Sequence, residues 1–408
     1  MIYNKKSLID LNLENETVLV RLDLNVPIKD GKVSDDKRIR EALPTLEYLL
    51  DNKCKIIVLS HFSRIKSIED KLSNKKTLRP VYEDIKNKLP NVKIDFCENN
   101  TNPKLKEIIS NMSYGSVLIL ENTRYNDVES DGSFSKKESK NDPNLGKFWA
   151  SLGNVFVNDA FGTAHRAHAS NVGIATNINE SCVGFLVEKE IKMLSKVLDS
   201  PFKPFVAIFG GAKISDKIES IENIAKLADH ILIGGGMSFT FLKALGHNVG
   251  ISLVENDSIN VAKDLLKKYP NKIVLPIDVL CSKDFSDSHS KHFSLEIDDD
   301  YMGLDIGPDT IKLFSEYLDN ANTIIWNGPV GVFEFEHYSK GTKAICKYMK
   351  EATDRGALTI VGGGDSAASA ISFGYENAFS HISTGGGASL VFFEGKNLIG
   401  IDAIKDNF

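Results

Sequence analysis

The chain has 408 residues and a mass of 45.0 kDa, a length that predicts two domains of ordinary size. Hydrophobic residues make up 42% and charged residues 25%, which excludes a disordered chain. The formal net charge of −6 argues against nucleic acid or an anionic membrane as partner. No apolar run approaches the roughly 20 residues that span a bilayer, and the N-terminus lacks a signal-peptide core. We therefore expect a cytoplasmic protein.

The cysteines support the same compartment. They are odd in number, far apart and form no Cys-x-x-Cys pair, which predicts reduced thiols without a disulfide framework or a zinc site. They are Cys54, Cys97, Cys182, Cys281 and Cys346.

Short apolar runs rich in β-branched residues recur along the first half and predict buried parallel strands. They are Val18–Val20, Ile56–Leu59, Val117–Leu120 and Val155–Val157. The segment Glu129–Asn141 is rich in Ser and Lys and predicts an exposed loop. A long helix is expected over Val183–Leu198, with a break at Asp199-Ser200-Pro201.

The second half repeats the pattern of strand, loop and helix. Its apolar runs are Phe205–Phe209, His230–Ile233, Ile273–Leu275, Thr323–Trp326 and Leu358–Val361. Amphipathic stretches between them, Asp216–Ala228 and Val261–Lys268, predict helices. Strands alternating with helices predict an α/β fold that occurs twice along the chain.

Arginine and glycine are unevenly distributed between the halves. Seven of the eight arginines precede residue 200, and 22 of the 30 glycines follow it. Arginine captures phosphate or carboxylate in bidentate pairs, whereas clustered glycine lets backbone amides approach a ligand closely. The counts alone are equally compatible with chance, so the positions of these residues must decide.

In the first half, an arginine follows each predicted strand. These arginines are Arg21, Arg64, Arg124 and Arg166, with Arg38 at the start of the next expected helix. Because the carboxyl ends of parallel strands meet at one edge of a sheet, these side chains predict a pocket for a small, multiply anionic ligand.

Other polar residues lie at the same strand ends. His61, His165 and His168 lack acidic partners at metal-ligand spacing, so hydrogen bonding to the anion or structural packing is favoured over a metal site. Asp23 either pairs with an arginine or accepts a hydrogen bond from a ligand hydroxyl.

In the second half, glycine runs follow the strands. They are Gly210-Gly211, Gly234–Gly236, Gly362–Gly364 and Gly385–Gly387. Together they predict a nucleotide-sized ligand lying over exposed backbone. Lys213 and Lys217 lie beside the first pair, where they suit phosphate, although the chain has no Walker A motif.

Two carboxylates near these glycines have alternative interpretations. Asp365 either caps a helix beginning at Ser366 or binds magnesium beside phosphates. Glu334 either accepts ribose hydroxyls or is an ordinary surface residue. An anion pocket in one domain and a nucleotide pocket in the other suit phosphoryl transfer.

A nucleotide-dependent dehydrogenase is the alternative enzyme. The pattern Gly362-x-Gly364-x-x-Ala367 fits a relaxed dinucleotide fingerprint. However, residues 380–384 lack the acid that would bind the ribose, which makes this alternative the weaker one. A non-enzymatic nucleotide sensor or scaffold is a further alternative.

The motifs of the chain resemble those of the phosphoglycerate kinases. The matching stretches are VLVRLDLNVP (18–27), DDKRI (35–39), NDAFGTAHRAHAS (158–170), GGAKISDKI (210–218), GGGMSFTFLKA (234–244), GLDIGP (303–308), WNGPVGVFE (326–334), GGGDSAA (362–368) and STGGGASL (383–390). They run from one end of the chain to the other in family order.

The resemblance implies two doubly wound, Rossmann-like domains and a monomer. A phosphoglycerate-binding domain would span 1–182, a hinge helix 183–200 and a nucleotide-binding domain 201–395, with a tail, 396–408, packing on the first domain. It also implies reversible phosphoryl transfer in glycolysis between 1,3-bisphosphoglycerate with Mg-ADP and 3-phosphoglycerate with Mg-ATP.

Carried over by motif, the resemblance implies three groups of site residues. The triose-phosphate contacts are Asp23, Asn25, Arg38, His61, Arg64, Arg124 and Arg166. The nucleotide contacts are Gly211, Ala212, Lys217, Gly235, Gly303, Asn327, Glu334, Gly363, Gly364, Asp365 and Ser366, with Asp365 as the Mg²⁺ ligand. The catalytic residues are Arg38 and Lys213, aided by helix N-termini at Gly364 and Gly386.

The chain departs from the family pattern in three places. The loop after His61 reads Phe62-Ser63-Arg64-Ile65, without the family's glycine and proline. The chain after Arg124 carries a polar insertion within 126–141, and Val391 replaces a usual acid. The resemblance therefore does not predict the shape of the loop after His61, although no predicted contact is lost.

Overall fold

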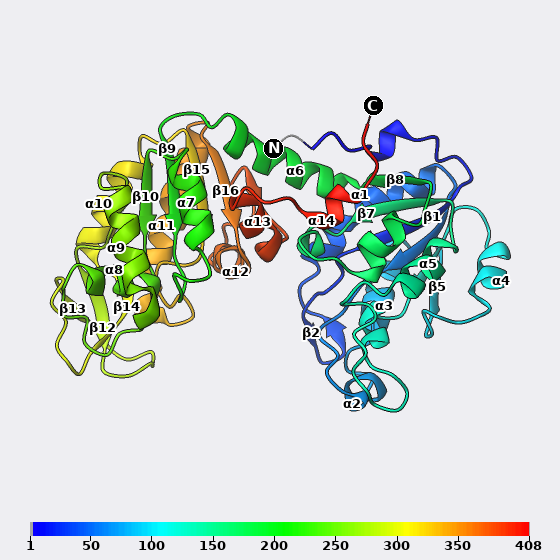
Figure 1. Ribbon diagram of the computed structural model, residues 1–408, viewed down its shortest axis with the longest axis horizontal. Coiled ribbons are helices and arrows are strands. Elements are labelled where there is room, and N and C mark those ends of the chain that lie inside the picture. Colours follow the sequence, from blue (N-terminus) through cyan, green and yellow to red (C-terminus); the bar gives the residue numbers. More distant parts are fainter. Residues whose placement is uncertain (1–2, 408) are drawn as a thin grey trace. The chain divides into compact units, whose positions relative to one another are not determined.

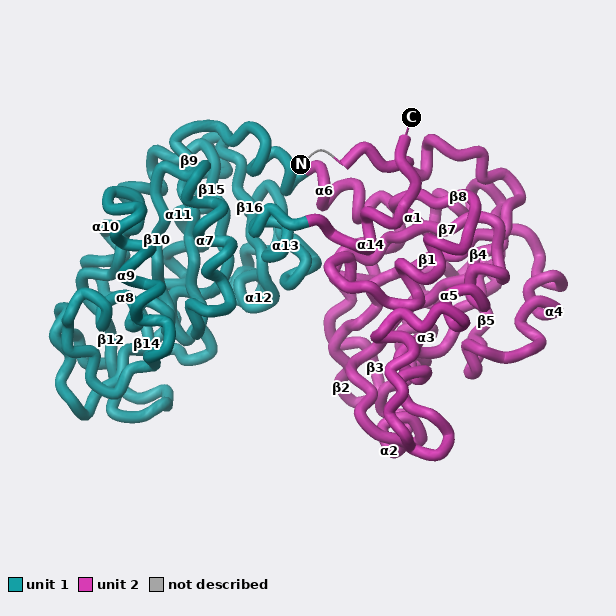
Figure 2. The backbone as a smooth tube through the Cα atoms, in the orientation of Figure 1, with its two compact units in different colours: residues 1, 193–396 teal, residues 2–192, 397–408 magenta. Residues whose placement is uncertain are grey.

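The computed structural model describes residues 3–407, which divide into two compact units (Figures 1 and 2). Unit 1 holds residues 193–396, and unit 2 holds residues up to 192 together with 397–407. Residues 1, 2 and 408, at the outer ends of the predicted domains, lie outside the described part. No helix among the described residues is long and apolar enough to cross a membrane.

Unit 2 is built on a six-stranded parallel sheet, in the order β5-β6-β4-β1-β7-β8. Its strands are β1 (Thr17–Leu22), β4 (Lys55–Leu59), β5 (Lys93–Cys97), β6 (Ser116–Leu120), β7 (Val155–Asp159) and β8 (Glu180–Val183), beside the hairpin β2 (Ile28–Lys29) and β3 (Lys32–Val33). Its helices are η1 (Leu8–Asp10), α1 (Lys37–Asp51), α2 (Ile68–Leu72), α3 (Arg79–Lys88), α4 (Leu105–Ser110), η2 (Thr123–Asp127), α5 (Pro143–Ala150), η3 (Phe161–Thr163), η4 (Ala169–Gly173) and α14 (Ile399–Asp402).

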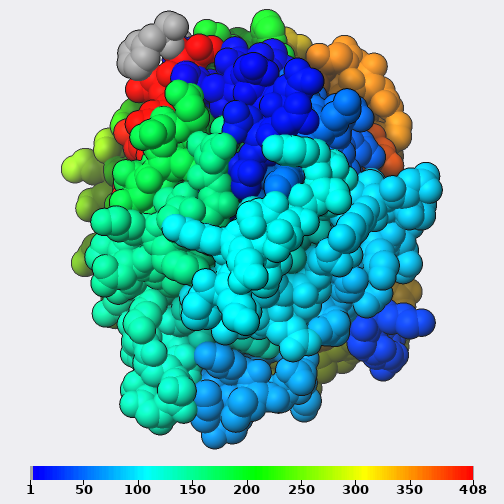
Figure 3. Space-filling view, turned by 90° about the vertical axis from the view of Figure 1, so that its right-hand side faces the viewer, coloured from blue at the N-terminus to red at the C-terminus, as the bar shows by residue number. Residues whose placement is uncertain are grey.

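Strand β1 shows why these apolar runs are strands. Val18 and Val20 pack into the core that α1 and α3 complete, while Leu19 points to the opposite face and is equally buried. A strand buried on both faces needs apolar residues at every position, which is the continuous pattern seen in the sequence. The edge strand β5 differs, because Lys93 and Asp95 are exposed, and the space-filling view shows this part of the chain in cyan at the surface (Figure 3). Charges on an edge strand oppose pairing with other chains.

Unit 1 contains a second six-stranded parallel sheet, in the order β11-β10-β9-β15-β16-β17, and an antiparallel sheet, β13-β12-β14. The strands are β9 (Phe205–Phe209), β10 (His230–Ile233), β11 (Ile273–Val274), β12 (Val279–Ser282), β13 (Lys291–Phe293), β14 (Met302–Ile306), β15 (Thr323–Asn327), β16 (Leu358–Gly362) and β17 (His381–Ile382). The helices are α7 (Ile218–Ala225), α8 (Met237–Ala244), η5 (Asn256–Ser258), α9 (Ile259–Lys268), α10 (Pro308–Leu318), η6 (Glu336–Tyr338), α11 (Lys340–Asp354), α12 (Gly364–Ser372) and α13 (Gly386–Phe393).

The order of strands in each parallel sheet reverses beside its first strand. Strand β1 lies between β4 and β7, and β9 lies between β10 and β15. Such switch points are where open α/β sheets bind ligands, at the carboxyl ends of the strands. The predicted α/β fold with two doubly wound parallel sheets is confirmed.

Helix α6 (Phe185–Asp199) contains the boundary between the units. It begins two residues later than the sequence predicted, because Val183 ends strand β8 and pairs there with Asn158. Helix α7 is shorter at both ends than the expected Asp216–Ala228. At its start, the backbone N of Lys217 donates to Ile214 O at 2.9 Å and closes a turn before the helix begins.

Helix α5 and the turn η4 approach closely at a pair of glycines. A Cβ added to Gly146 would lie 2.7 Å from Gly173 Cα and 2.8 Å from its carbonyl carbon. Because these neighbours are backbone atoms, they cannot move aside as a flexible side chain could. Glycine at 146 therefore sets the position of η4.

We predict that Gly146→Ala lowers the free energy of unfolding of unit 2 by about 1–3 kcal/mol through overpacking. Buried Trp149, in α5, would report on this unit by fluorescence during urea unfolding in a Trp326→Phe background. Lys147→Ala, on the exposed side of α5, is the matched control and should change stability by less than about 0.5 kcal/mol. Equal stability of the two variants would contradict this packing argument.

Candidate active site

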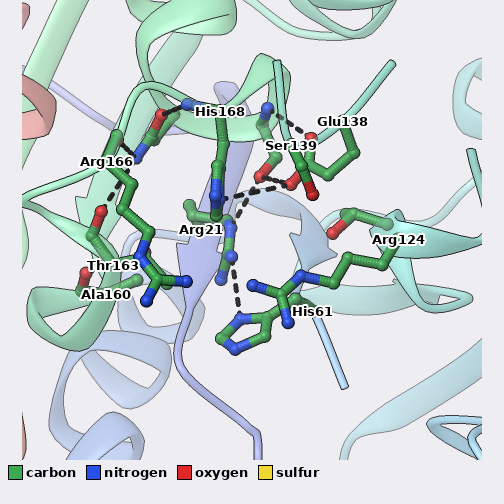
Figure 4. Close-up of polar contacts among 12 residues, drawn as sticks. Arg21, His61, Arg124, Glu138, Ser139, Ala160, Thr163, Arg166 and His168 are labelled. Carbon is green, nitrogen blue, oxygen red and sulfur yellow. Dashed lines mark hydrogen bonds and ion pairs between the residues drawn. The ribbon is translucent and has the colours of Figure 1, made fainter. Parts of the chain in front are cut away.

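A basic cavity of about 650 Å³ lies in unit 2 beyond the ends of its strands. Arg64 follows β4, Arg124 follows β6 and Arg166 follows β7, and all three line the cavity together with His168. Figure 4 shows Arg124 and Arg166 directed toward the same region as His61. The Arg124 Nε and His168 Nδ1 atoms are buried and have no hydrogen-bond partner among the described residues. The unpaired N–H of Arg124 beside clustered cations suits an anion.

The other predicted triose-phosphate contacts lie outside that cavity lining. Three of them, Asp23, Asn25 and Arg38, are joined to one another, whereas the His61 ring contacts Arg21 instead. Arg38 NH1 lies 3.1 Å from Asp23 Oδ1 and donates to the carbonyl of Asn25 at 3.0 Å. Asp23 therefore pairs with an arginine, which was one of its two predicted roles. The Asn25 side-chain oxygen accepts from Ser63 N at 2.8 Å, and the Ser63 carbonyl accepts from Arg124 NH1 at 2.6 Å. Ser63 thus links the group formed by Asp23, Asn25 and Arg38 to Arg124 in the cavity lining.

Ser63 explains how the loop after His61 folds without the family's glycine. Its φ angle is +55°, in the left-handed region that glycine adopts freely and other residues adopt at a cost of roughly 1 kcal/mol. Its amide and its carbonyl both make the hydrogen bonds described above, which hold it in this conformation. The loop therefore makes a left-handed turn at a serine, at the position where the family pattern has glycine.

The histidines around the basic cavity are kept neutral by their surroundings. Burial and the neighbouring arginines lower the pKa of His61 well below its usual value and that of His168 to about 3. Burial and Arg166 lower the pKa of His165 to about 4. Neutral rings avoid adding further positive charge beside Arg21, Arg124 and Arg166.

A second cavity, of about 530 Å³, lies in unit 1 at the switch point between β9 and β15. The predicted nucleotide contacts that line it are Gly211, Ala212, Gly235, Gly303, Glu334 and Asp365. Gly210 and Gly235 are required by close backbone packing. A Cβ at Gly210 would lie 2.2 Å from Pro329 O, and one at Gly235, whose φ is +64°, would lie 2.6 Å from Gly211 N. Such a bare backbone leaves amides accessible to a ligand.

Lys217, Asn327 and Ser366 are predicted nucleotide contacts that do not line this cavity. They form a network next to it, in which Lys217 Nζ donates to the side-chain oxygen of Asn327, and Ser366 Oγ accepts from Gly328 N at 2.6 Å. Burial lowers the pKa of Lys217 to about 8. Gly363 and Gly364 also lie outside the lining, and Lys213 is exposed.

Two helix N-termini converge beside this network. Helix α12 begins at Gly364 and α13 at Gly386, and a Cβ at Gly386 would lie 2.6 Å from Gly364 N. The positive ends of both helices therefore lie close together, where an anionic group is stabilised.

Asp365 lies within the first turn of α12, so its predicted role as the N-cap of a helix starting at Ser366 is wrong. The helix starts earlier because Gly363, with a φ of +93°, turns the chain into it. The carboxylate is exposed, lines the cavity of unit 1 and makes no hydrogen bond or ion pair with a described residue. A carboxylate without a protein partner, close to two helix N-termini that favour an anion, fits Mg²⁺, which takes one or two carboxylates in addition to phosphate oxygens.

Elsewhere in unit 1, Asp278, His292 and Asp309 bring possible metal-ligating atoms within 4.8 Å of one another. However, the Asp278 carboxylate already accepts from the backbone N of Asp309 and Thr310 at 3.0 and 2.7 Å and from His292 at 2.8 Å. It caps the start of α10, which is a structural role.

The structure also identifies residues that sequence reasoning missed. Apolar side chains that were not predicted as contacts form much of the cavity in unit 1: Phe239, Ile251, Leu253, Phe285, Met302 and Val332. In unit 2, Lys66, Phe134 and Lys136 line the basic cavity beside the arginines.

The segment Glu129–Asn141 was expected to be an exposed loop, and for Glu138 this is wrong, because its side chain is completely buried. Ser170 Oγ donates to it at 2.5 Å, which draws it under the cavity. Arg21 is also fully buried there. No spacing rule links these distant positions.

A basic cavity on one doubly wound sheet and a glycine-lined cavity on a second define a phosphotransferase of two units. A family profile described as phosphoglycerate kinase matches residues 8–396. A phosphoglycerate kinase of Staphylococcus aureus strain JH9 is 54% identical over 404 residues, covering 98% of this chain and 99% of that protein.

Solved structures agree with this. The phosphoglycerate kinase of Coxiella burnetii superposes with a TM-score of 0.84 at 35% identity, covering 98% of each chain. That of Pyrococcus horikoshii OT3 gives a TM-score of 0.81 at 30% identity, covering 97% of this chain and 98% of that one. The chain belongs to the phosphoglycerate kinase family.

The left-handed turn at Ser63 yields a matched pair of variants. Ser63→Gly should change the KM for 3-phosphoglycerate less than about twofold, because glycine adopts this conformation without strain. Ser63→Val should lower the melting temperature and raise that KM, since a β-branched residue strongly resists a positive φ and would displace the groups bonded to Asn25 and Arg124. Steady-state kinetics and thermal unfolding test both, and equal behaviour of the variants would contradict the argument.

The depressed pKa of His168 predicts a loss of stability in acid. Below about pH 6.5 the unfolded chain binds a proton at this histidine, whereas the folded chain does not until about pH 3. Stability therefore falls as the pH drops, by up to about 2 kcal/mol between pH 7 and pH 5. Urea unfolding should show a smaller loss for His168→Gln than for the wild type over this interval. Equal losses would show that His168 does not contribute.

Proposed function

We propose that this chain catalyses reversible phosphoryl transfer between 1,3-bisphosphoglycerate and ADP, giving 3-phosphoglycerate and ATP, the reaction by which glycolysis forms ATP from an acyl phosphate. The observation that carries the proposal is the pairing of an arginine-lined cavity with a glycine-lined one on separate sheets of a phosphoglycerate kinase.

The triose phosphate binds in unit 2. Arg64, Arg124 and Arg166 neutralise its phosphate, because they line a single cavity and Arg124 retains an unpaired buried donor. His61 donates a hydrogen bond to the ligand. Asp23 and Asn25 orient Arg38, and they accept from ligand hydroxyls where their lone pairs are free.

The nucleotide binds in unit 1. Its base and ribose occupy the apolar cavity, where Gly211, Ala212, Gly235 and Gly303 allow close approach and Glu334 accepts from the ribose. Its phosphates extend toward Lys217, Asn327 and the loop Gly363–Ser366. Asp365 would hold the Mg²⁺ of Mg-ATP or Mg-ADP, which supplies positive charge to the phosphate oxygens.

In the direction of ATP use, a carboxylate oxygen of 3-phosphoglycerate attacks the γ-phosphorus in line. A new O–P bond forms as the bond to the β-phosphate oxygen breaks, and ADP leaves with that electron pair. The attacking carboxylate is already ionised at pH 7, so no general base is required. Arg38, Lys213 and the amides at Gly364 and Gly386 stabilise the charge on the transferring group.

The attacking carboxylate must come into line with the γ-phosphate while water is excluded. We propose that the two units close about a hinge at α6 to achieve this. This helix supports the proposal because it contains the boundary between the units. The proposed division is 1–182, 183–200 and 201–395, with 396–408 packing on the first domain. The enzyme acts as a cytoplasmic monomer.

The decisive experiment measures ADP formation from Mg-ATP, with the acyl phosphate continuously consumed by a coupling enzyme. Turnover that requires both 3-phosphoglycerate and magnesium is expected. Binding of ATP without such turnover would overturn the proposal and favour a nucleotide sensor or scaffold. Reduction of a nicotinamide cofactor would favour the dehydrogenase alternative.

We predict that Arg38→Ala lowers kcat about 100-fold or more, because one donor to the transferring group is lost. Arg38→Lys, which keeps the positive charge and leaves Asp23 paired, should have a kcat between those of the wild type and Arg38→Ala. Arg79→Ala is the matched control, since Arg79 is a surface residue that bonds Glu98 and lies over the Phe96 ring. Near-normal kcat in folded Arg38→Ala would contradict the assignment.

A further inference from the structure

Arg21 is a completely buried cation beneath the basic cavity. It is the penultimate residue of strand β1, and its guanidinium makes three different hydrogen bonds, of which Figure 4 shows the one to His61. Nε donates to Ser170 Oγ at 2.8 Å, NH1 donates to the carbonyl of Leu22, and NH2 lies 3.1 Å from His61 Nδ1. Arg21 does not line the cavity, so the proposed reaction gives it no direct contact with substrate.

The contact with His61 fixes which ring nitrogen carries the proton. A guanidinium has only donors and stays protonated, so His61 Nδ1 must be the acceptor. A neutral imidazole whose Nδ1 accepts carries its proton on Nε2. Figure 4 shows this second ring nitrogen turned away from Arg21, and no described residue forms a hydrogen bond with it. The ring therefore presents an N–H donor that is available to a ligand.

Glu138 supplies the charge that balances Arg21. Its carboxylate is completely buried and accepts from both Ser170 N, at 3.0 Å, and Ser170 Oγ, at 2.5 Å. Ser170 Oγ at the same time accepts from Arg21, so one hydroxyl bridges the two charges. A hydroxyl that must donate to Glu138 can only accept from Arg21, which fixes the direction of the chain of bonds.

We propose that Arg21 and Glu138 are positioning residues: Arg21 holds His61 with its proton on Nε2, directed to the anionic ligand, and Glu138 holds Arg21 through Ser170. The inference rests on the proposed function, because it takes His61 to be a contact of 3-phosphoglycerate. Without Glu138, the remaining carboxylate that attracts Arg21 is Asp23, which already pairs with Arg38. Arg21 would then turn toward Asp23 and release His61.

The test combines NMR with kinetics. In protein labelled with ¹⁵N in its histidine rings, proton–nitrogen correlations report the tautomer of each ring without substrate, and a His61→Gln spectrum assigns the signal of His61. The wild type should show His61 as the neutral form with the proton on Nε2. Glu138→Gln should give a mixture of tautomers and raise the KM for 3-phosphoglycerate about tenfold or more, with kcat within about threefold, because one hydrogen bond to a charged ligand is misdirected.

Arg21→Lys is the second variant. It keeps the positive charge but cannot make all three hydrogen bonds, so His61 should again show a mixture of tautomers. Should Glu138→Gln fail to fold, Arg21→Lys decides the outcome. Glu129→Gln is the matched control, because Glu129 comes from the same segment but forms a surface ion pair with Lys137, and it should leave both readouts unchanged.

An unchanged His61 tautomer in both variants would overturn the proposal, even if the KM rises, because the residues would then act only through stability or charge. A wild type that shows the expected tautomer but no affinity for 3-phosphoglycerate would overturn the proposed function and leave the hydrogen-bond assignment standing. The two failures are thus distinguishable.

Discussion

The organisation of unit 2 depends on holding several positive charges together before any ligand neutralises them. Arg21, Arg124 and Arg166 raise the electrostatic cost of one another, which is why burial and mutual repulsion lower the pKa of Arg124. The fold limits this cost in two ways. His61 and His168 stay neutral, and the carboxylate of Glu138 lies buried among the cations. The cavity therefore remains positive enough to attract an anion without destabilising the sheet that carries it.

Unit 1 solves a different problem with the same sheet topology. The lining of its cavity contains no arginine or lysine, and the shape of the cavity comes from backbone segments that pass within a few ångströms of each other. At the switch point, Gly210 N donates to Asn327 O at 3.0 Å and Gly211 N to Pro329 O at 2.8 Å, which joins the loops after β9 and β15. A Cβ at Gly210 would lie 2.2 Å from Pro329 O, so a side chain there would force these loops apart. Glycine in one unit and arginine in the other thus suit two different ways in which a protein can bind phosphate.

The predictable part of the site is the part that lies at strand ends. The sequence locates Arg64, Arg124, Arg166 and the glycine runs, because a parallel sheet brings the carboxyl ends of its strands to one edge whatever the details of packing. The loop at Ser63 was less predictable. Its conformation follows from bonds to Asn25 and Arg124, 38 and 61 residues away in the chain, which no local rule for serine anticipates.

The sequence by itself determined the alternation of strands and helices and the occurrence of this α/β pattern twice along the chain, because both depend on local periodicity. It also determined the family, because the family is recognised from contiguous motifs. Only the tertiary structure decided that Asp23 pairs with Arg38, that Glu138 is buried and that Phe239 and Phe285 help to form the glycine-lined cavity. The reason is physical: burial and hydrogen bonding of a polar group depend on which distant segments pack around it. Glu138 illustrates this, since its partner Ser170 lies 32 residues away and Arg21 lies 149 residues before Ser170.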